Sequence, residues 1–168
     1  MEIINSLARM YPALSMIYAL QIKDIYLFCY LVISNILNGV YKYQLARPIM
    51  GDKKYPVLGK GTRPKGASHC GIWKDPPGYK TKSYGMPSGH AQEATGFATY
   101  IILDNLSKGK NILDITNIIV GFFALFIPYS RVYLNCHTFQ QIIVGGIIGI
   151  LMGMIAFYLR PIILSLIK

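Results

Sequence analysis

Long apolar stretches separated by short polar breaks run along most of the chain. Residues 25–41 and 137–159 contain no charged side chain, and 112–129 contains one, Asp114. At ~1.5 Å per residue, helices of this length cross or nearly cross the ~30 Å hydrocarbon core of a bilayer. A further helix is predicted from Ser88, a suitable N-cap residue, to about residue 106. The pattern therefore predicts about four main membrane spans.

The first 21 residues are also apolar, but Arg9 and Pro12 interrupt them. This segment fits either a helix at the membrane interface or a short, irregular first span. Because the N-terminus carries Glu2 and no basic cluster, we expect no cleavable signal peptide. Together the segments predict one all-α domain over residues 1–168, a polytopic helical bundle in a membrane.

Composition supports a membrane protein. Hydrophobic residues make up 53% of the chain and charged residues 14%, and the mean hydropathy is +0.39. These values are not typical of a soluble domain. In the last span, Gly145, Gly149 and Gly153 share one helical face, which predicts close packing against a neighbouring helix.

Residues 43–83 break this pattern and predict an extramembrane loop. Five prolines and six glycines argue against long regular elements there. Between Lys42 and Lys82 lie ten of the 17 Lys and Arg residues and only two aspartates, so this segment supplies +8 of the net charge of +10. We expect no nucleic-acid partner in so apolar a chain. An anionic lipid headgroup or a phosphate is the favoured ligand.

The stretch from Ser130 to Gln141 is a polar corner between two apolar segments. Ionisable side chains in or beside membrane spans are costly, which makes Arg131 and His137 functional candidates. On a helix that starts near His137, Gln141 is four positions on and shares its face. Arg131 reaches the same site only if the chain turns within residues 134–136.

Because successive spans reverse direction, the polar ends of four helices are predicted to meet on one side of the membrane. The groups gathered there are Lys42, Arg63, Ser88, Gly89, His90, Arg131, His137 and Gln141.

This set suits a phosphate ester. Lysine and arginine can bind phosphoryl oxygens, and the N–H groups of residues 88–90 open a helix, where an anion is favoured. Of two histidines, one neutral ring can attack phosphorus while the other protonates the leaving oxygen. Gln141 can hold the nucleophile's second nitrogen. No carboxylate cluster for a metal is apparent, so we expect no metal or cofactor. A lone histidine is more often structural, and only the combination favours catalysis.

Pro87-Ser88-Gly89-His90, with Ser130-Arg131 and the later His137 and Gln141, resembles two signatures of the type 2 phosphatidic acid phosphatase superfamily. The stretch from residue 130 to 141 is most similar to the dolichyl-diphosphate phosphatase branch. The resemblance implies a helical membrane core and metal-independent hydrolysis. It also implies His137 as nucleophile, His90 as general acid, and Lys42, Arg63 and Arg131 as phosphate ligands beside Ser88 and Gly89. Gln141 stands where most members have aspartate.

The first signature of that superfamily departs from its usual spacing, which is lysine, six residues, then Arg-Pro. After Lys42, Arg47-Pro48 follows four intervening residues and Arg63-Pro64 follows twenty. Arg63 is favoured because it leads directly into the loop before Ser88. Arg47 stays open as the alternative.

The sequence thus predicts a multi-pass membrane phosphatase of a lipid phosphate or diphosphate, of polyprenyl, dolichyl or phosphatidate type. An internal membrane such as the endoplasmic reticulum is a candidate location. A non-catalytic lipid-phosphate-binding protein with the same fold is the alternative, and a vanadium-dependent haloperoxidase is disfavoured by the hydrophobicity. The side that the site faces, the lipid tail and the oligomeric state stay open, and Cys29, Cys70 and Cys136 show no metal spacing.

Overall fold

The structure is a computed structural model, which describes residues 2–76 and 78–166. Its helices are α1 (Glu2–Gln21), α2 (Ile25–Val40), the π-helical η1 (Tyr41–Ala46), α3 (Arg47–Met50), α4 (Gly89–Ser107), α5 (Ile115–Tyr133) and α6 (Phe139–Leu166). Two short antiparallel strands, β1 (Lys54–Tyr55) and β2 (Gly59–Lys60), form a hairpin in the loop.

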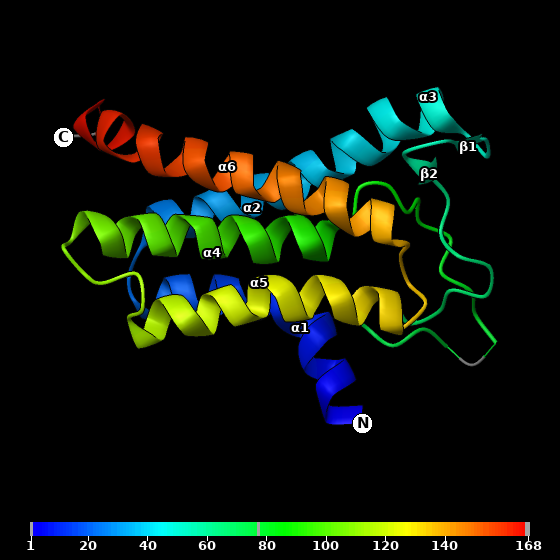
Figure 1. Ribbon diagram of the computed structural model, residues 1–168, viewed down its shortest axis with the longest axis horizontal. Helices are drawn as coiled ribbons and strands as arrows, with labels where there is room; N and C mark the ends of the chain where they lie inside the picture. Colours follow the sequence, from blue (N-terminus) through cyan, green and yellow to red (C-terminus); the bar gives the residue numbers. More distant parts are fainter. Residues whose placement is uncertain (1, 77, 167–168) are drawn as a thin grey trace.

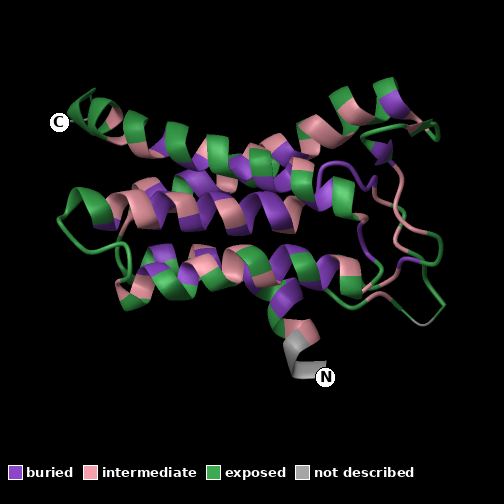
Figure 2. Cartoon of the chain, viewed as in Figure 1, coloured by how far each residue is buried: buried purple, intermediate pink, exposed green. Residues whose placement is uncertain are grey.

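Helix α4 is the centre of the bundle. It packs against α6, α5, α2 and α1, and Figure 1 shows α4, α5 and α6 lying side by side along the long axis of the molecule. Small residues on α4, including Ala91, Ala94 and Ala98, are buried, whereas the outer faces of α5 and α6 are exposed and apolar (Figure 2). Apolar outer faces are what a lipid environment requires.

Three helical segments of the described chain are long and apolar enough to cross a membrane: Ile25–Met50, Ile115–Tyr133 and Phe139–Leu166. The predicted all-α membrane bundle is confirmed. Helix α4 is less apolar than these three because it is enclosed by other helices and buries polar side chains such as Gln92 and Glu93.

The predicted glycine face of the last span packs against α4. A Cβ atom on Gly145 would meet the backbone of Ser88, and one on Gly149 would meet the backbone of Gln92. Any larger residue at these positions would push α6 away from α4. The glycines thereby hold the start of α6 close to the start of α4.

The prediction of a loop from residue 43 is wrong at its start, because the helix continues to Met50. The π-helical turn η1 carries it past Lys42, and such turns frequently occur at functional sites. Pro48 then stands in the first turn of α3, where a missing N–H group is tolerated. The remaining loop runs from Gly51 to Ser88 and covers one end of the bundle.

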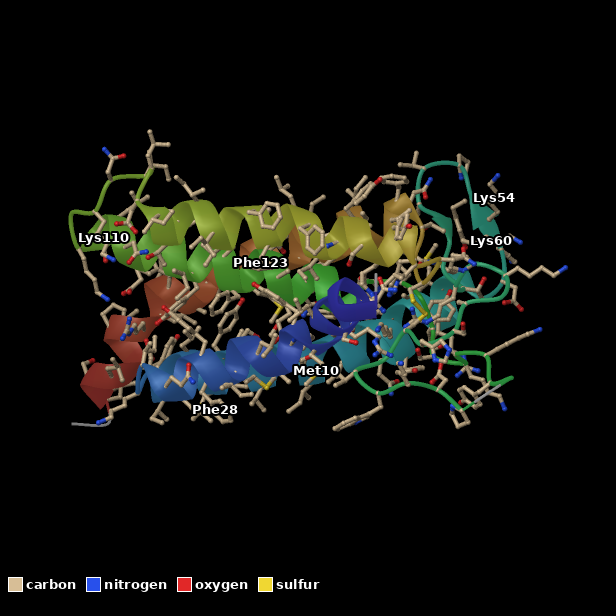
Figure 3. The ribbon with its side chains drawn as sticks, turned by 90° about the horizontal axis from the view of Figure 1, so that it is seen from below. Met10, Phe28, Lys54, Lys60, Lys110 and Phe123 are labelled. Atoms are coloured by element: carbon tan, nitrogen blue, oxygen red, sulfur yellow. A yellow bond between two sulfur atoms is a disulfide. The ribbon has the colours of Figure 1, made fainter. Side chains whose placement is uncertain are left out.

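The last helix also extends beyond the uncharged segment 137–159, because α6 continues through Arg160 and Pro161 to Leu166. Arg160 lies 3.0 Å from Asp24 and 2.9 Å from Asp104. These two ion pairs fix the helix at the end of the bundle opposite the loop. Figure 3 shows the two ends, with Lys54 and Lys60 on the loop side and Lys110 on the other.

Candidate active site

The turn between α5 and α6 places His137 next to Arg131. Asn135 adopts a left-handed φ of +52°, which asparagine tolerates better than most residues. The N–H groups of Cys136 and His137 both donate to the carbonyl of Arg131, at 2.9 and 3.1 Å. The chain therefore turns within residues 134–136, as the spacing predicts, and α6 begins two residues after His137.

A capping box orients Gln141. The Thr138 N–H donates to Gln141 Oε1 at 3.3 Å, and the Gln141 N–H donates to Thr138 Oγ1 at 3.4 Å. Gln141 Nε2 donates to the carbonyls of Lys60 and Thr62, at 2.9 and 2.8 Å. Because carbonyls only accept, the amide nitrogen must face the loop, and Oε1 must face His137.

This amide orientation fixes the tautomer of His137. Gln141 Oε1 lies 2.9 Å from His137 Nδ1, and since Oε1 can only accept, Nδ1 carries the hydrogen. The lone pair of the neutral ring is then on Nε2, which lies 2.9 Å from Nη1 of Arg63. The unprotonated ring nitrogen thus points toward the guanidinium of Arg63, while His137 itself is only 2% exposed.

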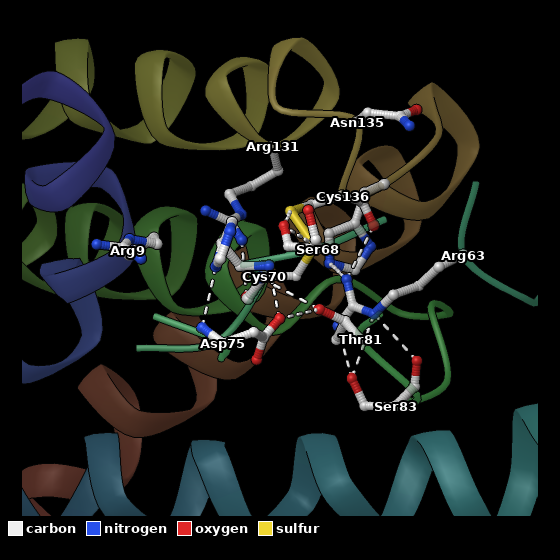
Figure 4. The surroundings of a disulfide bond; sticks show 12 residues. Arg9, Arg63, Ser68, Cys70, Asp75, Thr81, Ser83, Arg131, Asn135 and Cys136 are labelled. Carbon is white, nitrogen blue, oxygen red and sulfur yellow. Dashed lines mark hydrogen bonds between the residues drawn. A yellow bond between two sulfur atoms is a disulfide. The ribbon is translucent and has the colours of Figure 1, made fainter. Parts of the chain in front are cut away.

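The structure brings Arg63 to this site and leaves Arg47 away from it. The Arg63 guanidinium donates to the Ser83 carbonyl at 3.0 Å, to Ser83 Oγ at 2.9 Å and to the Cys136 carbonyl at 2.8 Å (Figure 4). Arg47 is exposed and lines a separate cavity beside Lys82. Ser83 is a site residue that the sequence analysis missed, because nothing in its motif distinguishes it from any loop serine.

Arg131 and Lys42 complete a group of three cations. Arg131 is fully buried, and its Nη2 donates to the Cys70 carbonyl at 2.7 Å. Its Nε and Nη1 have no hydrogen-bond partner within the described chain. The charges of Arg63, Lys42 and Arg131 all act on the His137 ring. Among the described residues, no carboxylate lies within ion-pair distance of any of the three.

His90 opens α4 at the same end of the bundle, and the same three cations act on it. Its Nε2 lies 3.0 Å from the Arg9 carbonyl. A carbonyl can only accept, so Nε2 carries a hydrogen and Nδ1 is the nitrogen left for a substrate. The main chain of α1, outside every signature, therefore orients this ring.

Ser88 and Gly89 differ in part from their predicted role as phosphate ligands. The Ser88 N–H donates to the Gln141 carbonyl at 3.1 Å, and Ser88 Oγ caps α4 by accepting from Ala91 N–H at 3.4 Å. The Ser88 N–H is thus not free for an anion. A Cβ on Gly89 would lie 2.8 Å from Asn38 Oδ1, so this glycine also permits close packing of α2. Gly89 and His90, at the first helical positions, keep N–H groups without an acceptor in α4.

Burial and charge keep the site's bases and acids in defined states. Burial lowers the pKa of His137 well below its ordinary value, and the charges of Arg63, Lys42 and Arg131 lower it further. The imidazole is therefore neutral at pH 7, as a nucleophile must be. Burial also lowers the pKa of Arg63, to about 10, so its guanidinium is still charged at pH 7.

A disulfide between Cys70 and Cys136 ties the loop to the α5–α6 turn, and sequence analysis did not find it. The two Cα atoms are 5.5 Å apart. The Cys70 carbonyl accepts a hydrogen bond from Arg131, and the Cys136 carbonyl accepts one from Arg63. Cys136 also directly precedes His137. A signal was present: with Cys29 inside a span, the other two cysteines are a pair on the predicted polar side.

Comparison with known proteins gives a family and several relatives. The sequence profile of the PAP2 superfamily matches residues 24–163. Dolichyldiphosphatase 1 of Dictyostelium discoideum is 38% identical over 108 residues, which cover 56% of this chain and 46% of that protein. Dolichyldiphosphatase of Saccharomyces cerevisiae is 38% identical over 87 residues, 49% of this chain and 36% of the relative. Human dolichyldiphosphatase 1 is 35% identical over 101 residues, which cover 54% of this chain and 39% of that protein.

The matched region extends over all the helices that carry the site, from α2 to α6. The chain spans less than half the length of these curated relatives. No solved structure matches it. The profile match covers most of the sequence and contains every predicted site residue, and the chain belongs to the PAP2 superfamily.

Proposed function

We propose that this protein is a membrane lipid phosphatase that forms a phosphohistidine on His137. One observation carries the proposal. The His137 ring is held by Gln141 so that its Nε2 lone pair faces Arg63, at 2.9 Å. A neutral nucleophile directed at a cluster of cations without acidic partners is suited to a phosphoryl group, whose negative oxygens the cations would bind.

In the first step, Nε2 of His137 attacks phosphorus and a P–N bond forms while the bond from phosphorus to the leaving oxygen breaks. Lys42, Arg63 and Arg131 hold the remaining phosphoryl oxygens. The three cations disfavour a charge on the His90 ring, and the bound phosphoryl anion offsets them, so that His90 can take its imidazolium form. This ring then gives the proton on Nδ1 to the leaving oxygen and keeps the proton on Nε2, which the Arg9 carbonyl accepts. The lipid, which has lost one phosphoryl group, then leaves.

In the second step, water attacks the phosphohistidine. Neutral His90 takes a proton from this water through Nδ1, an O–P bond forms, and the P–N bond breaks. Inorganic phosphate is released, and His137 and His90 return to their starting states. We expect no metal requirement, because the positive charge that compensates the phosphoryl group comes from three side chains of the protein.

The substrate we favour is a polyprenyl or dolichyl diphosphate, since the curated relatives are named dolichyldiphosphatases. Phosphatidate is the second candidate. By the same likeness, an internal membrane such as the endoplasmic reticulum is the expected location. Two apolar grooves along the bundle are suitable for a lipid tail.

Purified protein in detergent tests the proposal. In the presence of EDTA, the protein is incubated in separate reactions with farnesyl diphosphate, a polyprenyl diphosphate and phosphatidate. Released phosphate is measured in each reaction. We expect release from at least one diphosphate without metal, and none from His137→Ala. Binding of these lipids without release by the wild-type protein would favour the non-catalytic alternative, for which the loss of the family's aspartate at Gln141 would be the reason.

A further inference from the structure

Arg9 is a buried cation that no family signature includes. It lies in α1, before the region that the PAP2 profile matches, and is 7% exposed. Within the described chain its side chain makes one weak hydrogen bond, from Nη2 to Ser6 Oγ at 3.5 Å, and its Nε has no partner. No described carboxylate pairs with it. Burying an uncompensated guanidinium is costly, so an anionic ligand is expected there.

A polar cavity of about 310 Å³ adjoins this side chain. Its lining includes Ser6, Arg9, Ser68, His69 and Lys74. Hydroxyl, imidazole and cationic groups are the side chains that bind phosphate oxygens. The cavity is thus suited in size and chemistry to a phosphoryl group.

The cavity borders the active site. Its wall at Ser68 and His69 leads directly to Cys70, whose carbonyl holds Arg131. Its other wall is α1, where the carbonyl of Arg9 accepts from the ring of His90. Arg9 therefore contacts the proposed general acid through its carbonyl, while the charge of its guanidinium acts on Arg131.

In-line geometry indicates on which side of the phosphorus atom Arg9 would act. In phosphoryl transfer the attacking and leaving groups lie roughly in line on opposite sides of phosphorus. If His137 attacks from one side and His90 protonates the leaving oxygen on the other, the leaving group lies on the His90 side. For a lipid diphosphate, the leaving group is the inner phosphate with its lipid.

An apolar groove along the other face of the same helix can take the tail. It has a volume of about 390 Å³ and runs between α1 and α5 over α4, with Leu7, Tyr11, Leu14 and Phe123 in its lining. Leu7 and Tyr11 are each two positions from Arg9, so they lie on the opposite face of α1. A second apolar groove, of about 530 Å³, lies between α3 and α6 and includes Val144. That groove is on the α6 side, away from α1 and Arg9.

We propose that Arg9 and its cavity bind the inner phosphate of a lipid diphosphate, with the tail in the groove between α1 and α5. The inference rests on the proposed phosphatase function and narrows its substrate class. Lys42, Arg63 and Arg131 hold the outer phosphoryl group that is transferred. Arg9 holds the phosphate that stays on the lipid, so it favours diphosphates over monophosphates.

Binding without turnover provides the first test. Methylenediphosphonate, which cannot be hydrolysed at its P–C–P link, and inorganic phosphate are titrated by calorimetry into the purified full-length protein in detergent. We expect the wild type to bind the diphosphonate about 10- to 100-fold more tightly than phosphate, the range of a charge-assisted hydrogen bond. Arg9→Gln should lose that preference and keep its affinity for phosphate. Lys110→Gln, at the opposite end of the bundle, is the matched control.

Kinetics provide the second test. Arg9→Gln should lower kcat/KM for a polyprenyl diphosphate about 10- to 100-fold and leave kcat/KM for a polyprenyl monophosphate unchanged. Arg9→Lys, which keeps the charge, should retain most of the diphosphate preference, and it serves as the test if Arg9→Gln does not fold. Equal losses with both substrates would indicate a structural role and overturn the inference.

The experiments distinguish failure of the proposed phosphatase function from failure of the proposed role of Arg9. Absence of phosphate release from every lipid by the wild type would refute the phosphatase, whereas calorimetry would still decide whether Arg9 favours a diphosphate. If Arg9→Gln weakened the binding of inorganic phosphate as much as that of the diphosphonate, Arg9 would belong to the site of the transferred or released phosphate. That result would also overturn the inference.

Discussion

The two ends of the helical bundle differ in how their positive charges are compensated. At the end away from the loop, Arg160 lies 3.0 Å from Asp24 and 2.9 Å from Asp104, and its guanidinium stands over the Tyr100 ring at 5.8 Å. At the loop end, Arg131 is fully buried with two nitrogen atoms unpartnered, and no described carboxylate pairs with it.

This difference separates a structural cation from a ligand-binding one. Two carboxylates compensate Arg160, so its contribution is to stability. Lys42, Arg63 and Arg131 repel one another, and of these Arg63 also feels the charge of Asp75. An anion bound among the three cations would relieve that repulsion. The loop end is therefore less stable than it would be with apolar residues, as sites built for a charged substrate often are.

The largest effect should follow loss of the nucleophile. His137→Ala removes the proposed nucleophile, so phosphate release should fall by roughly 10⁴-fold or more. Brief incubation with a radiolabelled diphosphate and acid-free denaturation should label the wild type and leave His137→Ala unlabelled. Near-normal release by the variant would show that the nucleophile is assigned wrongly.

Substitution of one cation at each end tests the comparison itself. Arg131→Gln should lower kcat/KM by about 10²- to 10³-fold, the effect of losing one donor to a charged transition state. Its free energy of unfolding without ligand should not fall, because an uncompensated buried charge is removed. Activity in detergent and thermal unfolding are measured for both variants of the pair.

Arg160→Gln should have the reverse effect, lowering stability and leaving activity unchanged. It removes the cation that Asp24 and Asp104 share, although Asp104 keeps its ion pair with Lys108. The protein should be destabilised by about 2 kcal/mol, less than by loss of a fully buried pair, because the Arg160 side chain is 27% exposed. Its kcat/KM at low temperature should stay near that of the wild type. If Arg131→Gln were the destabilised variant and Arg160→Gln the inactive one, the distinction between the two ends would be wrong.

The disulfide should have a smaller effect on activity. Cys70 and Cys136 hold the carbonyls that position Arg131 and Arg63, so reduction, or replacement of both cysteines by serine, should lower kcat/KM by about tenfold. The free energy of unfolding should fall by about 2–4 kcal/mol. Cys29→Ser, which changes the free cysteine, should respond to reductant as the wild type does. Unchanged activity after confirmed reduction would show that the link does not position the site.

The smallest effect concerns the pH profile. Because burial and three cations lower the pKa of His137, its ring should stay neutral and nucleophilic well below pH 6.5, and the acid limb of kcat/KM that belongs to the nucleophile should lie there. Gln141→Asp places a carboxylate beside Nδ1, which raises this pKa and should move the limb to higher pH. An acid limb that did not move would mean that another group controls it.

Much of the site was predictable because it depends on short-range spacing. The helix start at Ser88, the turn at residues 134–136 and the contact between His137 and Gln141 follow from local capping and turn chemistry. The choice of Arg63 over Arg47 followed from its place in the chain before Ser88. The overall bundle followed from the length and apolar character of the segments.

What could not be predicted depends on contacts between distant parts of the chain. The Arg9 carbonyl reaches His90 from 81 residues away, and Cys70 reaches Cys136 across 66. Neither contact leaves a periodic or spacing signal. The extension of α6 past Pro161 also has no local signal, since proline disfavours a helix interior. Arg160, just before it, pairs with Asp24 and Asp104, which are distant in the sequence.

An experimental structure with bound orthovanadate tests the central claim most directly, since vanadate takes the geometry of the phosphoryl group in transfer. We predict vanadium next to Nε2 of His137, with Lys42, Arg63 and Arg131 around its oxygens and the His90 ring on the opposite side. Vanadate bound elsewhere, or the rings of His137 and His90 too far apart to enclose one vanadium atom, would contradict the account.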